Sequence, residues 1–248
     1  MTHSQRLVSC VVPARIGSTR YPQKPLALIK GIPLVVRTLE RGREADCFQR
    51  LICATDSHEI AQVVQEAGFE VVMTPSEMRT GSDRVAWVAD QMKLDFVLNL
   101  QGDEPLADLT LLRNLSCALV KQPDVWWTGA SPLRLEDRDN SSVVKVLVNQ
   151  NGDALDFTRG GTTFASEGET WLRHVGIYAY SRKQLYLFSS SPSSTAELEQ
   201  SLEQFRLFPD TPIRVVVTER HSLSVDRPED VGAVERYINL EQEYGHEF

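Results

Sequence analysis

The chain has 248 residues, 42% of them hydrophobic and 24% charged, with a formal net charge of −8. This is the composition of a globular protein long enough for one large α/β domain or two small ones. The negative charge argues against a broad nucleic-acid-binding surface. No apolar run approaches the roughly 20 residues that a membrane helix needs.

The first residues and the cysteines predict a cytoplasmic protein. Residues 1–6 run directly into a strand-like segment and lack the profile of a signal peptide. Cys10, Cys47, Cys53 and Cys117 are scattered and form no C-x-x-C pair. We therefore expect buried, reduced thiols and no zinc site.

Strand-like and helix-like segments alternate through the first hundred residues. Apolar β-type runs predict strands, and apolar residues at helical spacing predict helices. In chain order these are strand 7–12, helix 33–45, strand 50–56, helix 58–67, strand 70–73, helix 83–92 and strand 95–100. This alternation is typical of a doubly wound parallel sheet flanked by helices. Right-handed crossovers then bring the loops after the strands to one edge.

Three polar loops are predicted to meet at that edge: the loop that begins at Pro13, the loop near Thr80, and residues 101–105. Asp103 and Glu104 follow a buried strand, at the end where open α/β sheets bind their ligands. They could therefore hold a hard cation beside a phosphate. The alternative is a solvated turn made of Gly, Asp and Pro.

The loop after the first strand is rich in cations. Arg15, Arg20 and Lys24 lie within ten residues on a loop stiffened by prolines. Such a loop suits a triphosphate, which needs charge neutralisation and a defined geometry, and the N–H groups of Gly17 and Ser18 could bind phosphate oxygens. The sequence matches neither the P-loop nor the G-x-G-x-x-G fingerprint, and the alternative is a solvated basic loop.

The second half of the chain no longer alternates regularly between predicted strands and helices. The predicted elements are helix 109–119, strand 126–130, a hairpin over 143–158, strand 174–180, a serine-rich connection at 189–194, a helix capped by Thr195, strand 213–217 and helix 227–244. No linker-like composition precedes this part. We therefore expect an antiparallel addition to the same sheet, in a single domain spanning 1–248.

Several blocks resemble one family, the 3-deoxy-manno-octulosonate cytidylyltransferases (CMP-Kdo synthetases). They occur in the family's order and span nearly the whole chain. The blocks are Val12–Leu26, Ala54–Asp56, Val72–Thr74, Thr80–Arg84, Asn99–Leu106, Val143–Val146, Leu155–Arg159, Leu172–Tyr180, Leu202–Arg206 and Val225–Asp230.

The resemblance implies a glycosyltransferase-A-like nucleotidyltransferase with a mainly parallel central sheet. The nucleotide-binding half would be about 1–120, and the sugar-binding and dimerisation half about 121–248. In such an enzyme the 2-hydroxyl of a keto-sugar acid attacks the α-phosphate of CTP with Mg²⁺ assisting, for lipopolysaccharide synthesis. We also expect a homodimer on this resemblance.

The resemblance also implies roles for individual residues of the nucleotide half. Arg15, Ser18 and Lys24 would hold the triphosphate. Asp103 and Asp226 would be the metal ligands, which is sensible chemistry because Mg²⁺ prefers oxygen ligands. The expected catalytic residues are Arg15, Lys24 and Asp103, and the expected nucleotide-binding residues are Ala14, Arg15, Ser18, Lys24, Arg84 and Gln101. Asp226 could alternatively be a helix cap.

The resemblance places the sugar acid against Arg159, His174, Tyr178, Glu203 and Gln204. Arg159 would pair with the sugar carboxylate, and Glu203 with Gln204 would bind hydroxyls. His174 could instead be structural, and Glu203 and Gln204 could occupy a wet helix face. We nominate no general base, because a metal-lowered hydroxyl pKa makes one unnecessary.

The sequence departs from the family's pattern at three places. Residues 160–164 read Gly-Gly-Thr-Thr-Phe and the segment to Trp171 is short, Gln23 stands where Gly is usual, and Ser82 stands where Thr is usual. The nucleotide half is therefore better supported than the sugar half. The alternatives are an enzyme for an 8-amino-octulosonate, one for another keto-sugar acid such as a nonulosonate, one for a polyol phosphate, or a nucleotide-binding paralogue with weakened or lost turnover.

Overall fold

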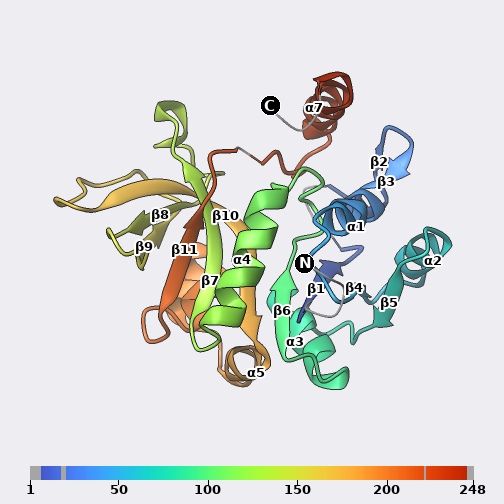
Figure 1. The fold of residues 1–248 in the computed structure, drawn as a ribbon, viewed down its shortest axis with the longest axis horizontal. Helices are drawn as coiled ribbons and strands as arrows, with labels where there is room; N and C mark the ends of the chain where they lie inside the picture. The colour runs from blue at the N-terminus through green and yellow to red at the C-terminus, as the bar shows by residue number, and fades with distance from the viewer. Residues whose placement is uncertain (1–6, 18–20, 221, 245–248) are drawn as a thin grey trace.

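The computed structural model describes residues 7–17, 21–220 and 222–244. One large sheet runs through the molecule in the order β11-β7-β10-β6-β1-β4-β5, and the β8–β9 hairpin joins it by pairing with β10 (Figure 1). Its strands are β1 (Val8–Ala14), β4 (Leu51–Thr55), β5 (Glu70–Met73), β6 (Phe96–Asn99), β7 (Trp126–Pro132), β8 (Lys145–Val148), β9 (Ala154–Thr158), β10 (Thr170–Ser181) and β11 (Ile213–Val217).

The strand directions confirm the predicted sheet. β1 pairs in parallel with β4 and β6, β4 with β5, and β11 with β7. β10 runs antiparallel to β6, β7 and β8, and the predicted hairpin is β8 with β9. The sheet is therefore mainly parallel around β1, with an antiparallel addition built on β10.

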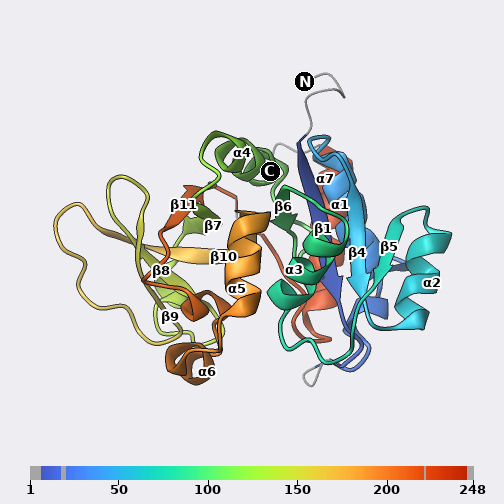
Figure 2. The same ribbon diagram turned by 90° about the horizontal axis from the view of Figure 1, so that it is seen from below.

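Helices cover both faces of the sheet because its strands alternate their apolar side chains. In β1, Cys10 and Val12 face α1, α2 and α4, whereas Val11 faces α3 and α5. Figure 2 shows α3 and α5 on the opposite side of the sheet from α4. The helices are α1 (Leu34–Glu44), α2 (His58–Glu66), α3 (Gly81–Gln91), α4 (Leu109–Lys121), α5 (Arg182–Ser190), α6 (Thr195–Gln200) and α7 (Asp230–Tyr244).

Three expectations about helices need correction. The sequence analysis gave no helix at α5, and the serine-rich connection begins only at Ser191. Ser194, not Thr195, caps α6, because its hydroxyl accepts from the Glu197 N–H at 3.0 Å while its backbone is extended. α7 begins at Asp230 rather than Arg227, and the Asp230 carboxylate accepts from the backbone N–H of Asp226 and Arg227.

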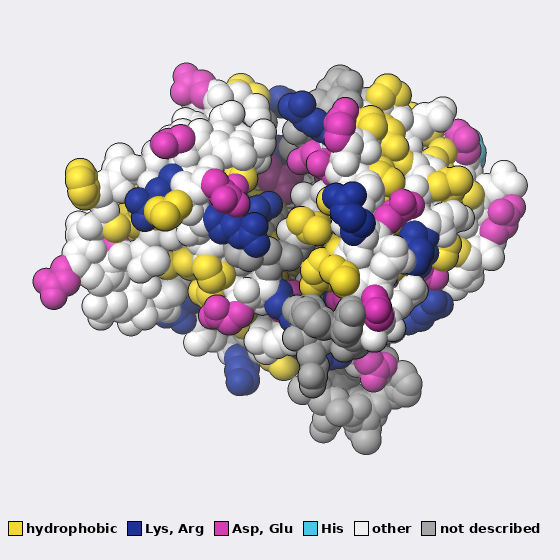
Figure 3. All heavy atoms as spheres, turned by 90° about the horizontal axis from the view of Figure 1, so that it is seen from above, with side chains coloured by type: hydrophobic (Ala, Val, Ile, Leu, Met, Phe, Trp, Pro, Cys, Tyr) yellow, Lys and Arg dark blue, Asp and Glu magenta, His cyan; other side chains and the backbone are white. Residues whose placement is uncertain are grey.

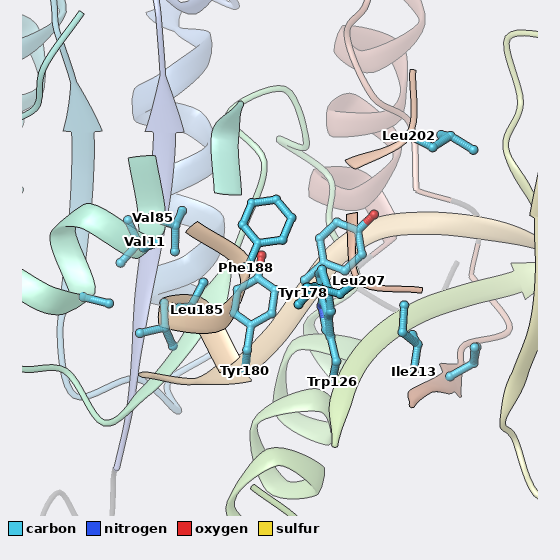
Figure 4. Close-up of a cluster of buried hydrophobic side chains, with 14 of the residues drawn as sticks. Val11, Val85, Trp126, Tyr178, Tyr180, Leu185, Phe188, Leu202, Leu207 and Ile213 are labelled. Carbon is cyan, nitrogen blue, oxygen red and sulfur yellow. The ribbon is translucent and has the colours of Figure 1, made fainter. Parts of the chain in front are cut away.

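The aromatic core lies on the α5 face of the sheet (Figure 4). The Trp126 ring lies 5.7 Å from Tyr178, 5.2 Å from Tyr180 and 5.7 Å from Phe188. Trp126 is buried, whereas Trp127 is half-buried. This packing fixes the part of β10 from which Tyr178 and Tyr180 project.

The end of the chain returns to the first half. α7 packs with Val234 against Leu34 of α1 and Ile29 of the short β2 (Leu28–Ile29), which pairs with β3 (Ile32–Pro33). Before it, the Val225 N–H donates to the Asp103 carbonyl at 2.9 Å. The segment that precedes α7 is thus attached to the loop after β6, and α7 lies against elements of the first half of the chain.

The cysteines differ in burial. Cys10 and Cys53 are buried, and burial raises the pKa of both thiols, that of Cys53 to about 12, so they stay protonated. Cys47 and Cys117 are half-buried, which corrects the expectation that all four are buried. None of the helices in the described part of the chain combines the length and apolar character that a membrane span needs.

Candidate active site

Three loops enclose a first cavity of about 260 Å³, which we call the nucleotide cavity after the role that the resemblance implies for its residues. They are the predicted ones: the loop after β1, the residues before and at the start of α3, and the loop after β6. The lining residues are Pro13, Ala14, Arg15, Lys24, Pro25, Arg79, Thr80, Gly81, Arg84, Gln101, Gly102 and Asp103. Ser18 and Arg20, also expected on this side, lie outside the described residues.

Close backbone packing brings these loops together. A Cβ atom on Gly102 would lie 2.8 Å from the Pro13 carbonyl oxygen, so the loop after β6 approaches the loop after β1 only because residue 102 is glycine. The loop before α3 ends in a capping box, in which the Thr80 hydroxyl accepts from the Asp83 N–H and the Asp83 carboxylate accepts from the Thr80 N–H. Both features fix the walls of the nucleotide cavity.

The nucleotide cavity carries four cationic side chains. Arg15 and Arg79 are exposed, whereas Lys24 and Arg84 are largely covered. The Arg84 guanidinium donates to the Asp56 carboxylate at 2.8 Å and also to the Thr74 hydroxyl. Arg84 thus joins the loops after β4 and β5 to the cavity. The sequence analysis missed Arg79, although it directly precedes the Thr80–Arg84 block.

A second cavity of about 280 Å³ adjoins the first, and we call it the acceptor cavity after the role that the resemblance implies for its residues. The two share Gln101 and Asp103. The acceptor cavity is lined further by Glu104, Ser142, Val143, Val144, Arg159, Arg173, His174, Val175, Gly176, Tyr178, Ser201, Leu202, Glu203, Gln204, Ser222, Ser224 and Asp226. All five residues expected at the sugar therefore line one cavity, and the face of the molecule seen in Figure 3 is hollowed near its middle, with acidic and basic side chains around the hollow.

Asp103 and Asp226 converge on one cation, the Lys24 ammonium. Lys24 Nζ lies 2.6 Å from Oδ2 of Asp103 and 3.5 Å from Oδ1 of Asp226. The two carboxylates therefore border a position that suits a positive charge, and they fit a magnesium ion chemically. Within the described residues no group of three or more His, Cys, Asp or Glu side chains could hold a metal. Further ligands to such an ion would be phosphate oxygens and water, as is usual for Mg²⁺.

Glu104 lies beside this pair. The pKa of its carboxyl is raised to about 7, mainly by burial and in addition by the neighbouring Asp103 charge, while a hydrogen bond from the Ser222 hydroxyl opposes the shift. The Glu104 side chain therefore joins the loop after β6 to the segment that carries Asp226. Of the two acidic residues considered for a cation, Asp103 is the one that contacts Lys24.

His174 and Tyr178 of β10 and Gln204 of η4 (Glu203–Arg206) are neutral polar side chains that face the acceptor cavity. Burial lowers the pKa of His174 to about 3, and its Nε2 lies 2.9 Å from the Thr128 hydroxyl. Tyr178 donates to Oε1 of Gln204 at 3.0 Å, and burial raises the pKa of Tyr178. Nε2 of Gln204 is buried with no hydrogen-bond partner among the described residues. A buried donor without a partner suits a ligand oxygen.

Two arginines give the acceptor cavity its positive charge. Arg159 Nη1 makes a long 3.5 Å contact to the Ser141 carbonyl, and Arg173 Nη1 lies 3.4 Å from Asp137. The buried Lys145 ammonium donates to the Arg159 carbonyl at 3.0 Å and so fixes the backbone from which Arg159 projects. Sequence reasoning missed Arg173, although it directly precedes His174 in a resembling block.

Comparisons with known proteins agree with this geometry. The cytidylyltransferase family pattern matches residues 9–212. The chain is 37% identical to the 3-deoxy-manno-octulosonate cytidylyltransferase of Bdellovibrio bacteriovorus, over 92% of this chain and 96% of that one. It is 39% identical to the enzyme of the same name from Chlorobium phaeobacteroides, over 91% and 94%.

A solved structure of CMP:2-keto-3-deoxy-manno-octonic acid synthetase complexed with CTP gives a TM-score of 0.88 at 33% identity. The match covers 94% of this chain and 99% of that one. This likeness confirms the predicted nucleotidyltransferase fold. The chain therefore belongs to the 3-deoxy-manno-octulosonate cytidylyltransferase family.

Proposed function

We propose that the chain activates a 3-deoxy-manno-octulosonate-type keto-sugar acid with CTP, giving the CMP-sugar and pyrophosphate for lipopolysaccharide synthesis. The observation that carries the proposal is the junction of the two cavities at Asp103 and Gln101, because a group transfer between two substrates needs their reacting atoms side by side. The relatives' shared name and the CTP in the related solved structure support the choice of substrates.

In this proposal the nucleotide cavity binds CTP. Arg15 and Lys24, with Ser18, hold the triphosphate, and Ala14, Arg84 and Gln101 border the nucleotide. Lys24 neutralises charge near the reacting phosphate, because a mobile ammonium can leave the carboxylates and contact phosphate oxygens. Arg79 adds a further cation to the same cavity.

Asp103 and Asp226 are proposed to hold Mg²⁺, which would neutralise phosphate charge and lower the pKa of the acceptor hydroxyl. The support is their common contact to the Lys24 ammonium. An Asp103→Asn variant should lose at least about 100-fold in turnover, because electrostatic stabilisation of a transferred phosphoryl group is worth several kcal/mol. Its circular dichroism should match that of the wild type, and full activity would remove Asp103 from the metal site.

The acceptor cavity is proposed to bind the sugar acid, with Arg159 at its carboxylate and His174, Tyr178, Glu203 and Gln204 at its hydroxyls. The 2-hydroxyl oxygen forms a bond to the α-phosphorus, and the bond from that phosphorus to the bridging oxygen of the β-phosphate breaks. Pyrophosphate leaves, and the hydroxyl proton passes to solvent.

The test is pyrophosphate release from CTP and Mg²⁺ with 3-deoxy-manno-octulosonate, its 8-amino analogue or a sialic acid as the acceptor. Release with the octulosonate is the expected result. The 8-amino analogue, other acceptors and loss of turnover are not favoured, because the curated relatives carry the octulosonate name. If the protein binds CTP but releases no pyrophosphate with any of the three acceptors, the proposed function is contradicted.

We also propose a cytoplasmic homodimer. Leu135, Leu155 and Phe164, all in the second half of the chain, expose large apolar side chains that a partner subunit could cover. The buried, protonated Cys10 and Cys53 thiols suit a reducing compartment. Light scattering tests the dimer, and the mass of a monomer at micromolar concentration would contradict it.

A further inference from the structure

Glu203, in the acceptor cavity, is held by a residue of α3. Its Oε1 accepts from the Ser82 hydroxyl at 2.8 Å, and its Oε2 faces the Ser82 backbone N–H at 3.4 Å. Ser82 is fully buried, whereas Glu203 is half-buried and lines the cavity. The orientation of the Glu203 carboxylate toward the acceptor is thus set by hydrogen bonds from Ser82.

The Ser82 hydroxyl also has partners on two strands. Asn99 Nδ2 of β6 donates to Ser82 Oγ at 3.2 Å, and the Tyr180 hydroxyl of β10 lies 3.0 Å from it. Because the single hydroxyl proton of Ser82 is donated to Glu203, Ser82 Oγ accepts from Asn99 and from Tyr180. Every hydrogen-bonding position of this oxygen is therefore used, and its direction is fixed by three separate elements.

The same group of side chains reaches the nucleotide cavity. Thr80 and Gly81, which directly precede Ser82, line that cavity. Gln101 lines both cavities and donates from Nε2 to Oδ1 of Asn99 at 3.2 Å. Hydrogen bonds thus run from Gln101 through Asn99 and Ser82 to Glu203, across the boundary between the two cavities.

We propose that Ser82 is a positioning residue that aligns the Glu203 carboxylate for the acceptor's hydroxyls and joins that alignment to the wall of the nucleotide cavity. The inference rests on the proposed function, because it takes the second cavity to be the acceptor site. The inference predicts a selective effect: the Ser82 hydroxyl supports binding of the acceptor and not binding of CTP.

The charges around Glu203 agree with this role. Burial raises the pKa of its carboxyl, the nearby Asp83 charge raises it further, and the two Ser82 donors and the Arg206 charge lower it. Arg206 is itself paired with Asp83 and with Glu197 at 2.6 Å. Removing the Ser82 hydroxyl therefore weakens the support of the ionised, hydrogen-bond-accepting form of Glu203.

The first experiment compares Ser82→Ala, which removes the hydroxyl, with Ser82→Thr, which keeps it. Hydrogen bonds to charged groups are worth enough to change affinity about tenfold or more. We expect Ser82→Ala to raise the KM for 3-deoxy-manno-octulosonate at least about tenfold, with the KM for CTP within about threefold, and Ser82→Thr to restore the acceptor KM. Ser116→Ala is the matched control, because Ser116 is also a buried helical serine and its hydroxyl donates to the Leu112 carbonyl away from both cavities.

A double-mutant cycle tests whether Ser82 acts through Glu203. In a Glu203→Gln background, Ser82→Ala should change the acceptor KM by less than about threefold, because the group it positions has already been altered. If Ser82→Ala does not fold, Ser82→Cys replaces it, since a thiol has similar size and is a much weaker donor.

The outcomes separate the two proposals. A wild-type protein that releases no pyrophosphate with the octulosonate overturns the proposed function. With an active wild type, the role of Ser82 is overturned if the KM values for CTP and acceptor rise together, if neither changes, if Ser82→Thr does not restore the acceptor KM, or if the two substitutions act independently in the cycle.

Discussion

The Lys24 ammonium lies between the Asp103 and Asp226 carboxylates, at 2.6 Å from the first and 3.5 Å from the second. In this arrangement a side chain of the protein neutralises the same two groups that we assign to a magnesium ion. On the proposed metal assignment, lysine and metal are alternative partners for these carboxylates, and binding of the metal would make Lys24 available to the triphosphate.

A Lys24→Met variant tests this relationship. Without Mg²⁺ the two carboxylates lose the charge of the ammonium, so the melting temperature should fall, and added Mg²⁺ should raise it more than in the wild type because a cation then binds this acidic pair without competition from Lys24. Turnover should drop at least about 100-fold through loss of phosphate stabilisation. Differential scanning fluorimetry over a MgCl₂ series measures the first effect.

The control for this variant is Lys183→Met, which removes a lysine whose pairing with Asp124 at 3.6 Å is exposed. Such pairs contribute little to stability, so its melting temperature and its response to Mg²⁺ should equal those of the wild type. A Lys24→Met protein with the wild-type response to Mg²⁺ would contradict the shared position of lysine and metal.

Gly102→Ala should damage both stability and activity. The added Cβ would meet the Pro13 carbonyl oxygen at 2.8 Å, and backbone must move to admit it. We expect a loss of about 1–3 kcal/mol in the free energy of unfolding and a large fall in turnover, because the two loops would move apart. Urea denaturation and the pyrophosphate assay measure the two effects.

The matched change is Gly232→Ala in α7, where the nearest atom to the added Cβ is the end of the Arg236 side chain at 3.5 Å. Alanine favours a helix interior over glycine by up to about 1 kcal/mol, so this variant should be more stable than the wild type. Equal effects of the two substitutions would contradict the steric argument.

His174 should make the fold sensitive to acid. Its pKa is lowered to about 3 in the folded protein by burial, whereas the ordinary value is 6.5, so the unfolded chain takes up a proton that the folded chain does not. Above pH 6.5 this difference costs nothing, and the free energy of unfolding falls as the pH drops from 6.5 toward 3. The loss from His174 amounts to about 2 kcal/mol at pH 5. A His174→Gln variant should lose less stability than the wild type between pH 7.5 and pH 5 in urea titrations, and parallel curves would contradict this.

Gln23 adopts a backbone conformation that favours glycine, with φ at 55°. Relief of this strain is partly cancelled by the greater freedom of glycine in the unfolded chain, so Gln23→Gly should be neutral or stabilise the protein by up to about 1 kcal/mol. Gln23→Val should destabilise it by about 1–2 kcal/mol, because β-branched residues tolerate this region least. As a contrast, Gln62→Gly inside α2 should cost about 0.5–1 kcal/mol, and a loss of the same size at Gln23→Gly would contradict the assignment of strain.

The sequence was most informative where local pattern and tertiary position agree. The apolar runs that became β5 and β11 were predicted at their observed ends, because a buried strand between polar loops leaves little freedom. The convergence of the loops after β1 and β6 followed from the handedness of crossovers. The departure at Gln23 was visible in the sequence, but its left-handed backbone was not.

Other features depend on contacts between residues far apart in the chain. The helix α5 was missed because its sequence merges into a serine-rich connection, and it is defined by the packing of Phe188 on Trp126. The hydrogen bonds of Ser82 involve partners in three other elements, and the paired contact of Lys24 involves a segment near residue 226. The spacing of residues in a single sequence does not predict such long-range contacts.

The attachment of Val225 to Asp103 has a consequence for biosynthesis. Asp103 is synthesised shortly after β1, β4, β5 and β6, but Asp226 follows β11, the last strand in the described part of the chain. A partly translated polypeptide therefore exposes a basic loop without the second carboxylate beside it. We expect ribosome-bound intermediates to bind magnesium nucleotides poorly, so that translation releases the enzyme in a competent form only after the final helix has docked.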